Sequence, residues 1–74
     1  MTPKQFNSLK VGDRVKINKK ILDPRKLGSD LTIEAGETGV VVKKNSFGYC
    51  FLLVKLDTLD TPVLIMRSEA EINP

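Results

Sequence analysis

The stretch that decides the fold is residues 34–44, EAGETGVVVKK, in which two glycines precede three valines and two lysines. A phosphate-binding loop needs a longer glycine spacing, a following lysine and a helix, whereas three β-branched valines favour a strand. Glu34 and Glu37 would also repel a phosphate. We therefore interpret Gly36 as a turn residue with positive φ, and Gly39 as the point where a curved strand crosses another.

The segments on either side of this corner predict further short strands. Residues 11–17, VGDRVKI, begin with a turn and then alternate apolar and polar side chains. Residues 49–56 and 63–66 are apolar runs separated by a turn at 57–61, and residues 68–71 predict one helical or 3-10 turn before a very short last strand at Ile72. These segments together predict about five strands.

The long polar connection at residues 18–33 is predicted as a loop, held to the body by its few apolar side chains. At the N-terminus, Thr2 can cap a short helical turn, because Pro3 suits the first helical position and Gln5 lies three residues after the cap. Phe6 and Leu9 would then share one face and cover one end of the core.

These segments resemble a known group of folds. VGDRVKI is similar to the GD-x-V-x-I first strand of Src-homology-3-like small barrels, and EAGETGVVV is similar to the G-x-x-G-x-V element of KOW motifs. The resemblance covers roughly residues 11–72. It implies an all-β, five-stranded, strongly curved antiparallel barrel, with a long loop after the first strand and a 3-10 turn before the last. The connection at 18–33 is too long for a KOW motif, which weakens the case for ribosomal-type RNA binding.

Length and composition limit the classes of function. With 74 residues, the chain is a single domain, divided into an N-terminal turn at 1–10 and a barrel at 11–72. It has no histidine and one cysteine, Cys50, which lies in an apolar run and is expected to be a core residue. We expect no metal, no cofactor and no enzyme activity, since the acid pairs Glu34/Glu37 and Glu69/Glu71 lack an apolar enclosure. No apolar run is long enough to cross a membrane, and no secretory signal opens the chain, so a cytoplasmic location is expected.

The net charge of +3 is unevenly distributed. Residues 1–26 hold eight basic and two acidic residues, or +6, which leaves −3 for the remainder. This imbalance predicts a surface for an anionic partner, with lysines that only keep a small barrel soluble as the favoured alternative. The candidate residues of this surface are Arg14, Lys16, Lys19, Lys20, Arg25, Lys26, Lys43 and Lys44.

A second candidate surface comes from strands that are apolar on both faces. A barrel core can take only one row of side chains from each strand, so a second row stays outside. We expect that row to be covered by the N-terminal turn, by the loop at 18–33 or by another polypeptide, with the loop favoured. The row consists of Phe51, Leu53, Leu64 and Met66.

The sequence thus predicts a non-catalytic interaction module that binds a protein partner or associates with itself. The alternative is nucleic-acid binding, RNA or DNA, through the basic surface in the manner of a KOW domain. Single-strand binders need exposed aromatic rings, and Phe47 at the turn 45–48 is the one candidate. We favour its folding back onto the barrel.

Overall fold

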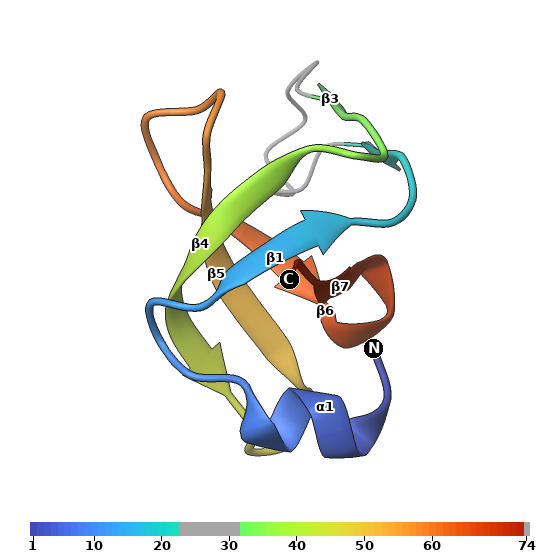
Figure 1. The fold of residues 1–74 in the computed structure, drawn as a ribbon, viewed down its shortest axis with the longest axis vertical. Helices are drawn as coiled ribbons and strands as arrows, with labels where there is room; N and C mark the ends of the chain where they lie inside the picture. Colours follow the sequence, from blue (N-terminus) through green and yellow to red (C-terminus); the bar gives the residue numbers. More distant parts are fainter. Residues whose placement is uncertain (23–31, 74) are drawn as a thin grey trace.

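A five-stranded antiparallel sheet forms the centre of the computed structural model, which describes residues 1–22 and 32–73 (Figure 1). The strands are hydrogen-bonded in the order β6-β5-β4-β1-β7. They are β1 (Arg14–Ile17), β4 (Thr38–Asn45), β5 (Phe51–Leu56), β6 (Val63–Met66) and β7 (Ala70–Ile72). The mostly-β architecture expected from the sequence is confirmed.

The longest strand, β4, joins the two sides of this sheet. It pairs with β1 through residues such as Gly39, opposite Val15, and with β5 along its whole length. The register shifts between Val41 and Lys43, so Val42 is an extra residue on the β4 side. A bulge of this kind bends a strand and increases its twist, and β4 curves strongly in Figure 1.

The core lies on one face of this curved sheet. Side chains alternate between buried and more accessible along β1, β5 and β6, as the sequence pattern predicts. The buried strand residues form a single cluster, and each such side chain stabilises the fold by roughly 1.5–3 kcal/mol. They are Val15, Ile17, Val41, Leu52, Val54, Leu56, Val63, Ile65 and Ala70.

The short helix α1 (Pro3–Ser8) closes one end of the core. Its N-terminus has the predicted capping box, in which the Gln5 backbone N–H donates to Thr2 Oγ1 over 3.1 Å and the Thr2 backbone N–H donates to Gln5 Oε1 over 3.0 Å. Phe6 and Leu9 are buried in the core cluster. Both the cap and the covering role of this turn are confirmed.

The expected irregular loop at 18–33 is partly wrong, because its two ends pair. The strands β2 (Ile21–Leu22) and β3 (Thr32–Ile33) form a separate two-stranded sheet. Ile21 lies opposite Ile33, and both are buried in the core cluster. Their burial supplies the energy for a pairing that local sequence does not reveal. The expectation for the segment between these strands lies outside the described residues.

The helical turn near the C-terminus is displaced by one residue from its predicted place. The 3-10 turn η1 comprises Arg67–Glu69, and β7 begins at Ala70, which is buried and pairs with Ile17. The expected cap was Ser68, but the Met66 backbone N–H donates instead to Glu69 Oε1 over 2.8 Å. The need to bury Ala70 ends the turn early. The strand predicted from Tyr49 likewise begins only at Phe51.

The two glycines of the fold-deciding stretch have the predicted roles. Gly36 has φ +95° in a turn closed by the Glu37 N–H and the Glu34 carbonyl, 3.3 Å apart. Gly39 lies in close contact with β5, and a Cβ there would stand 2.6 Å from the Lys55 carbonyl oxygen and 2.8 Å from the Leu56 Cα. Both neighbours are backbone atoms of a paired strand, so they cannot move aside without breaking the pairing.

We therefore expect Gly39→Ala to lower the free energy of unfolding by about 3 kcal/mol, because the added methyl group overpacks against backbone. Denaturant unfolding measures the change. Gly36→Ala is the matched control: a Cβ there meets nothing within 4 Å, and only the positive φ is unfavourable, so the expected loss is about 1 kcal/mol. A loss at Gly39 no larger than that at Gly36 would contradict the close-contact interpretation.

Candidate interaction surface

Four apolar side chains lie on the face of β5 and β6 that points away from the core. Phe51 is paired with Met66 across the strands, and Leu53 with Leu64. All four are half-buried, while their neighbours in the strands are buried. The predicted second row is therefore present, and its members cover one another as two cross-strand pairs. We call Phe51, Leu53, Leu64 and Met66 the outer patch.

The predicted cover for this patch is not supplied by the N-terminal helix. α1 lies across one end of the sheet (Figure 1), and its buried side chain, Phe6, belongs to the core cluster. The ends of the 18–33 connection also contribute to the core, through Ile21 and Ile33. The favoured cover, the middle of that connection, falls outside the described residues. The outer patch therefore remains a candidate contact surface.

Two aromatic rings project from the hairpin between β4 and β5. Phe47 is 91% exposed and Tyr49 is 81% exposed. The turn is held by Asn45, whose Nδ2 donates to the carbonyl oxygens of Phe47 over 2.8 Å and Tyr49 over 2.7 Å. We call Phe47 and Tyr49 the aromatic tip. The expectation that Phe47 folds back is wrong, because the turn backbone closes around the Asn45 amide and leaves the rings outside.

A hollow of about 290 Å³ connects the aromatic tip with the outer patch. Its walls come from the hairpin and from the junction of β6 with η1. The lining residues are Gly48, Tyr49, Cys50, Met66, Arg67 and Ser68. Cys50 is half-buried and packs against the core, as expected of a structural cysteine. Because Met66 belongs to both, the hollow and the outer patch form one continuous surface.

The cations Lys43 and Arg67 lie beside the hollow and the outer patch, together with the carboxylate of Glu69, which accepts a hydrogen bond from the Met66 backbone N–H. Lys43 is exposed and lies opposite Leu53, on the patch side of the sheet. Arg67 is half-buried and follows Met66 directly. Among the described residues, neither of these cations forms an ion pair with a carboxylate. This face therefore combines apolar surface with unneutralised positive charge.

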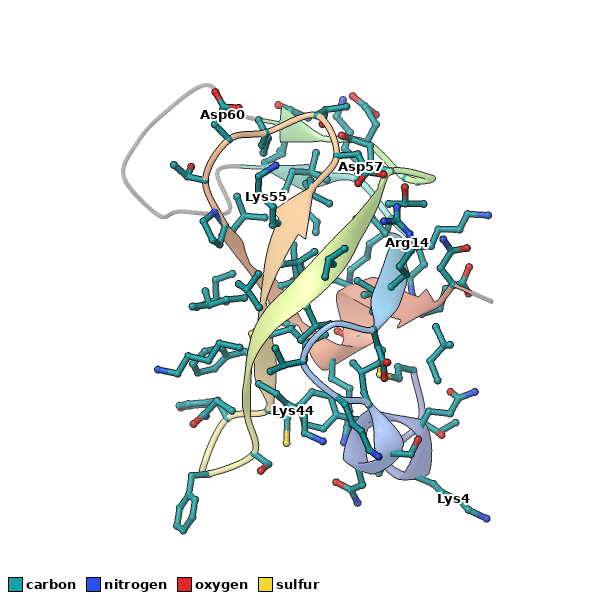
Figure 2. All side chains as sticks on the ribbon, turned by 60° about the vertical axis from the view of Figure 1, so that its left-hand side comes forward. Lys4, Arg14, Lys44, Lys55, Asp57 and Asp60 are labelled. Carbon is teal, nitrogen blue, oxygen red and sulfur yellow. The ribbon has the colours of Figure 1, made fainter. Side chains whose placement is uncertain are left out.

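Two of the basic residues proposed from the sequence are instead engaged within the fold. Lys44 Nζ donates to the carbonyl oxygens of Phe6, Asn7 and Leu9, over 2.8, 3.1 and 2.9 Å. It also lies 5.1 Å from the centre of the Phe6 ring, and Figure 2 shows it beside α1. Its three N–H donors are thus used at the C-terminal end of the helix. They secure α1 to β4.

Arg14 is the second engaged cation. Its Nη2 lies 2.7 Å from Asp57 Oδ2, which also accepts a 2.6 Å hydrogen bond from Thr38 Oγ1 (Figure 2). The hydrogen bond from Thr38, followed by that from Arg14, lowers the pKa of Asp57 below its ordinary value of 3.8. This network connects β1, β4 and the turn after β5, so we assign it a structural role in holding these segments together.

The remaining predicted cations in residues 16–20 lie at the surface. Lys20 lies 3.9 Å from a Glu34 carboxylate oxygen, and Lys16 and Lys19 are exposed. Arg25 and Lys26 lie outside the described residues. The sequence did not predict Tyr49, which was assigned as the first residue of a strand, or Arg67 as surface contacts. The available signal for the aromatic tip was the pair of turn-forming residues, Asn45 before the two rings and Gly48 between them.

The acidic side chain of Glu37 has partners within the fold. Glu37 Oε2 accepts a 2.7 Å hydrogen bond from the Glu34 backbone N–H, and Glu37 Oε1 accepts one of 2.6 Å from Thr58 Oγ1. Within residues 1–22 and 32–73, no three Cys, Asp or Glu side chains gather as a metal site would require. The acids at this corner therefore hold the turn.

Comparisons of the chain with protein-family models, with curated proteins and with solved structures find no match. In the part of the chain that the structure describes, no helix is long and apolar enough to cross a membrane. The geometry of this surface is therefore the basis for assigning a function.

The Asp57 network predicts a dependence on pH. Because the pKa of Asp57 is lowered in the folded state, its contribution to stability is complete above the ordinary value of 3.8 and is lost as the pH falls through the folded value. Thr38→Val removes the largest cause and should raise the Asp57 pKa toward 3.8, as followed by an NMR titration of the carboxyl carbon. Thr58→Val, whose hydroxyl contacts Glu37 instead, should leave the Asp57 pKa unchanged. An unchanged value in Thr38→Val would contradict the assignment.

Proposed function

We propose that this domain is a non-catalytic interaction module that binds a protein partner through the outer patch and the aromatic tip. The observation that carries the proposal is the pair of rings at the tip, with 91% and 81% of their surface exposed. A monomer gains nothing from leaving Phe47 and Tyr49 in water, since burying each would stabilise it by roughly 1.5–3 kcal/mol. Large rigid aromatic side chains are instead enriched at interface hot spots.

The outer patch supports the same proposal. Its four half-buried side chains lie beside the tip and are joined to it through the hollow. Together they would give a partner an apolar centre, with Lys43 and Arg67 at its border. An apolar centre with a polar rim is the usual anatomy of a protein interface.

Nucleic-acid binding is the second candidate function, and the aromatic tip is the observation in its favour. Exposed rings can stack on the bases of a single strand. One feature counts against it. Arg14 and Lys44, from the predicted basic surface, already have partners within the chain. Strong, salt-dependent binding to a phosphate backbone requires several cations in a row on the surface that are not already paired within the protein.

We also propose that the sheet closes into the Src-homology-3-like barrel that the sequence resembles. The strand order, the bulge at Val41–Lys43 and the 3-10 turn before β7 support it. So does the single core cluster, which includes Ile65 of the edge strand β6 and Ala70 of the edge strand β7. In a flat sheet four strand spacings of about 4.8 Å would separate these two strands.

A solution NMR measurement tests this closure. We expect methyl–methyl nuclear Overhauser effects between Ile65 and Ala70, because a barrel brings both edges of the sheet to one core. Cross-strand effects between Leu53 and Leu64 serve as the control, since this pair is adjacent in either arrangement. Absence of the first set while the second is strong would rule out the barrel.

The interaction proposal is tested by photocrosslinking in the source cells. A benzophenone amino acid replaces Phe47 in one variant and the exposed Lys16 of β1 in a control variant. We expect a discrete protein adduct from position 47 and not from position 16. The adduct should be lost when Leu53→Thr and Leu64→Thr are added, and retained with Ile72→Thr, which changes an exposed residue of β7.

Each other outcome has a defined meaning. An adduct of twice the chain mass would mean self-association, and a nuclease-sensitive adduct would favour nucleic acid. Equal background labelling from both positions would contradict the proposal. Thermal unfolding of every variant identifies any that fails to fold, and Ile72→Thr measures the effect of a threonine substitution in a strand away from the outer patch.

A further inference from the structure

We infer that the hollow between Tyr49 and Arg67 binds an acidic peptide segment, with one apolar side chain of that segment in the hollow and a neighbouring carboxylate on the Arg67 guanidinium. This inference rests on the proposed function and specifies the chemistry of the partner. The volume of the hollow, about 290 Å³, lies at the lower limit for pockets that bind small molecules. It suits a single side chain better than a cofactor.

The lining of the hollow has an apolar and a polar part. Met66, Cys50 and the ring of Tyr49 supply sulfur and hydrocarbon surface, which favours an aliphatic or aromatic side chain. Arg67 and Ser68 supply hydrogen-bond donors on the η1 side. An occupant that satisfies both parts must combine an apolar group with an acceptor.

The positive charge of Arg67 favours an acceptor that carries a negative charge. Among the described residues no carboxylate forms an ion pair with it. The acid two residues along the chain, Glu69, is held by its 2.8 Å hydrogen bond from the Met66 backbone N–H. A half-buried guanidinium has a planar set of donors that matches a carboxylate in a bidentate pair. A peptide aspartate or glutamate would supply this carboxylate.

The surroundings favour a peptide over a nucleic acid. Lys43, on the same face, adds a second cation that pairs with no carboxylate in residues 1–22 and 32–73, and it extends the positive border. A single-stranded nucleic acid would need a longer row of cations. Lys44, the next residue on β4, already donates hydrogen bonds to three carbonyl oxygens. The outer patch next to Met66 offers apolar surface rather than phosphate ligands. Charge and lining together therefore point to an acidic, partly apolar peptide.

A random peptide library displayed on phage provides the test. The whole domain should select peptides in which an acidic residue lies beside a large apolar one. With Arg67→Gln the preference for acidic residues should disappear while the apolar preference remains, and Tyr49→Ala should weaken the apolar preference. Lys16→Gln is the matched control, because it removes one positive charge from an exposed site on β1, and it should select the same peptides as the unchanged domain.

The best selected peptide is then titrated into the isotope-labelled domain. We expect amide shifts concentrated at residues 48–50 and 66–68, a loss of affinity of about tenfold or more in Arg67→Gln, and partial recovery in Arg67→Lys. The inference is wrong if no peptide is enriched, if the acidic preference survives Arg67→Gln, or if the shifts lie elsewhere. Oligonucleotides of deoxythymidine are titrated in parallel, and their binding in place of peptide would also overturn it.

Failure of this inference is distinguishable from failure of the proposed function. Should the crosslinked adduct at position 47 persist unchanged in Arg67→Gln, the interaction surface stands and the assigned chemistry is wrong. Should no adduct form at all, the proposed function itself fails, whatever the peptide library selects.

Discussion

The absence of a side chain at Gly39 is the constraint on which the sheet depends. Gly39 is paired on both sides, with Val15 of β1 and with Leu56 of β5, and its Cα faces backbone atoms of β5 too closely for a Cβ. This contact fixes β4 between its two neighbours before the strand bends at Val41–Lys43. Beyond the bend β4 continues with β5 alone, so the register set at Gly39, together with the one-residue shift at Val42, determines which residues of β5 face the core.

That register explains why the candidate interaction surface lies on β5 and β6. Leu52, Val54 and Leu56 fill the core, and the residues between them must point outward. Phe51 and Leu53 are apolar, although side chains at outward-facing positions of a strand can be polar. A strand that only had to hold the fold could carry polar residues there, as β1 does with Arg14 and Lys16. The surplus of apolar side chains on one outer face is therefore a feature that the described part of the fold leaves unexplained, and the proposed binding would account for it.

Features set by neighbouring residues were predictable from the sequence. The capping box of α1, the turn at Gly36 and the alternation of β5 each depend on residues a few positions apart. Features set by distant residues were not. The pairing of Ile21 with Ile33 depends on a shared core, and Lys44 reaches carbonyl groups 35 to 38 positions earlier in the chain. The exposure of Phe47 was missed for a different reason, because it depends on the direction in which one amide side chain, that of Asn45, bonds.

The contrast between two arginines shows why net charge alone does not locate the charges that the fold leaves unpaired. Arg14 belongs to the basic first third of the chain, yet its guanidinium is matched by Asp57 and Thr38 and holds three segments together. Arg67 lies in the part of the sequence with a net negative charge, yet no carboxylate among the described residues pairs with it. Since a partner responds to charges that the fold has left unpaired, the local balance at Arg67 matters more than the total over residues 1–26. The same reasoning distinguishes Lys43 from Lys44, which are adjacent in sequence. Lys43 is exposed beside the outer patch, whereas Lys44 Nζ donates hydrogen bonds to carbonyl oxygens at the C-terminal end of α1.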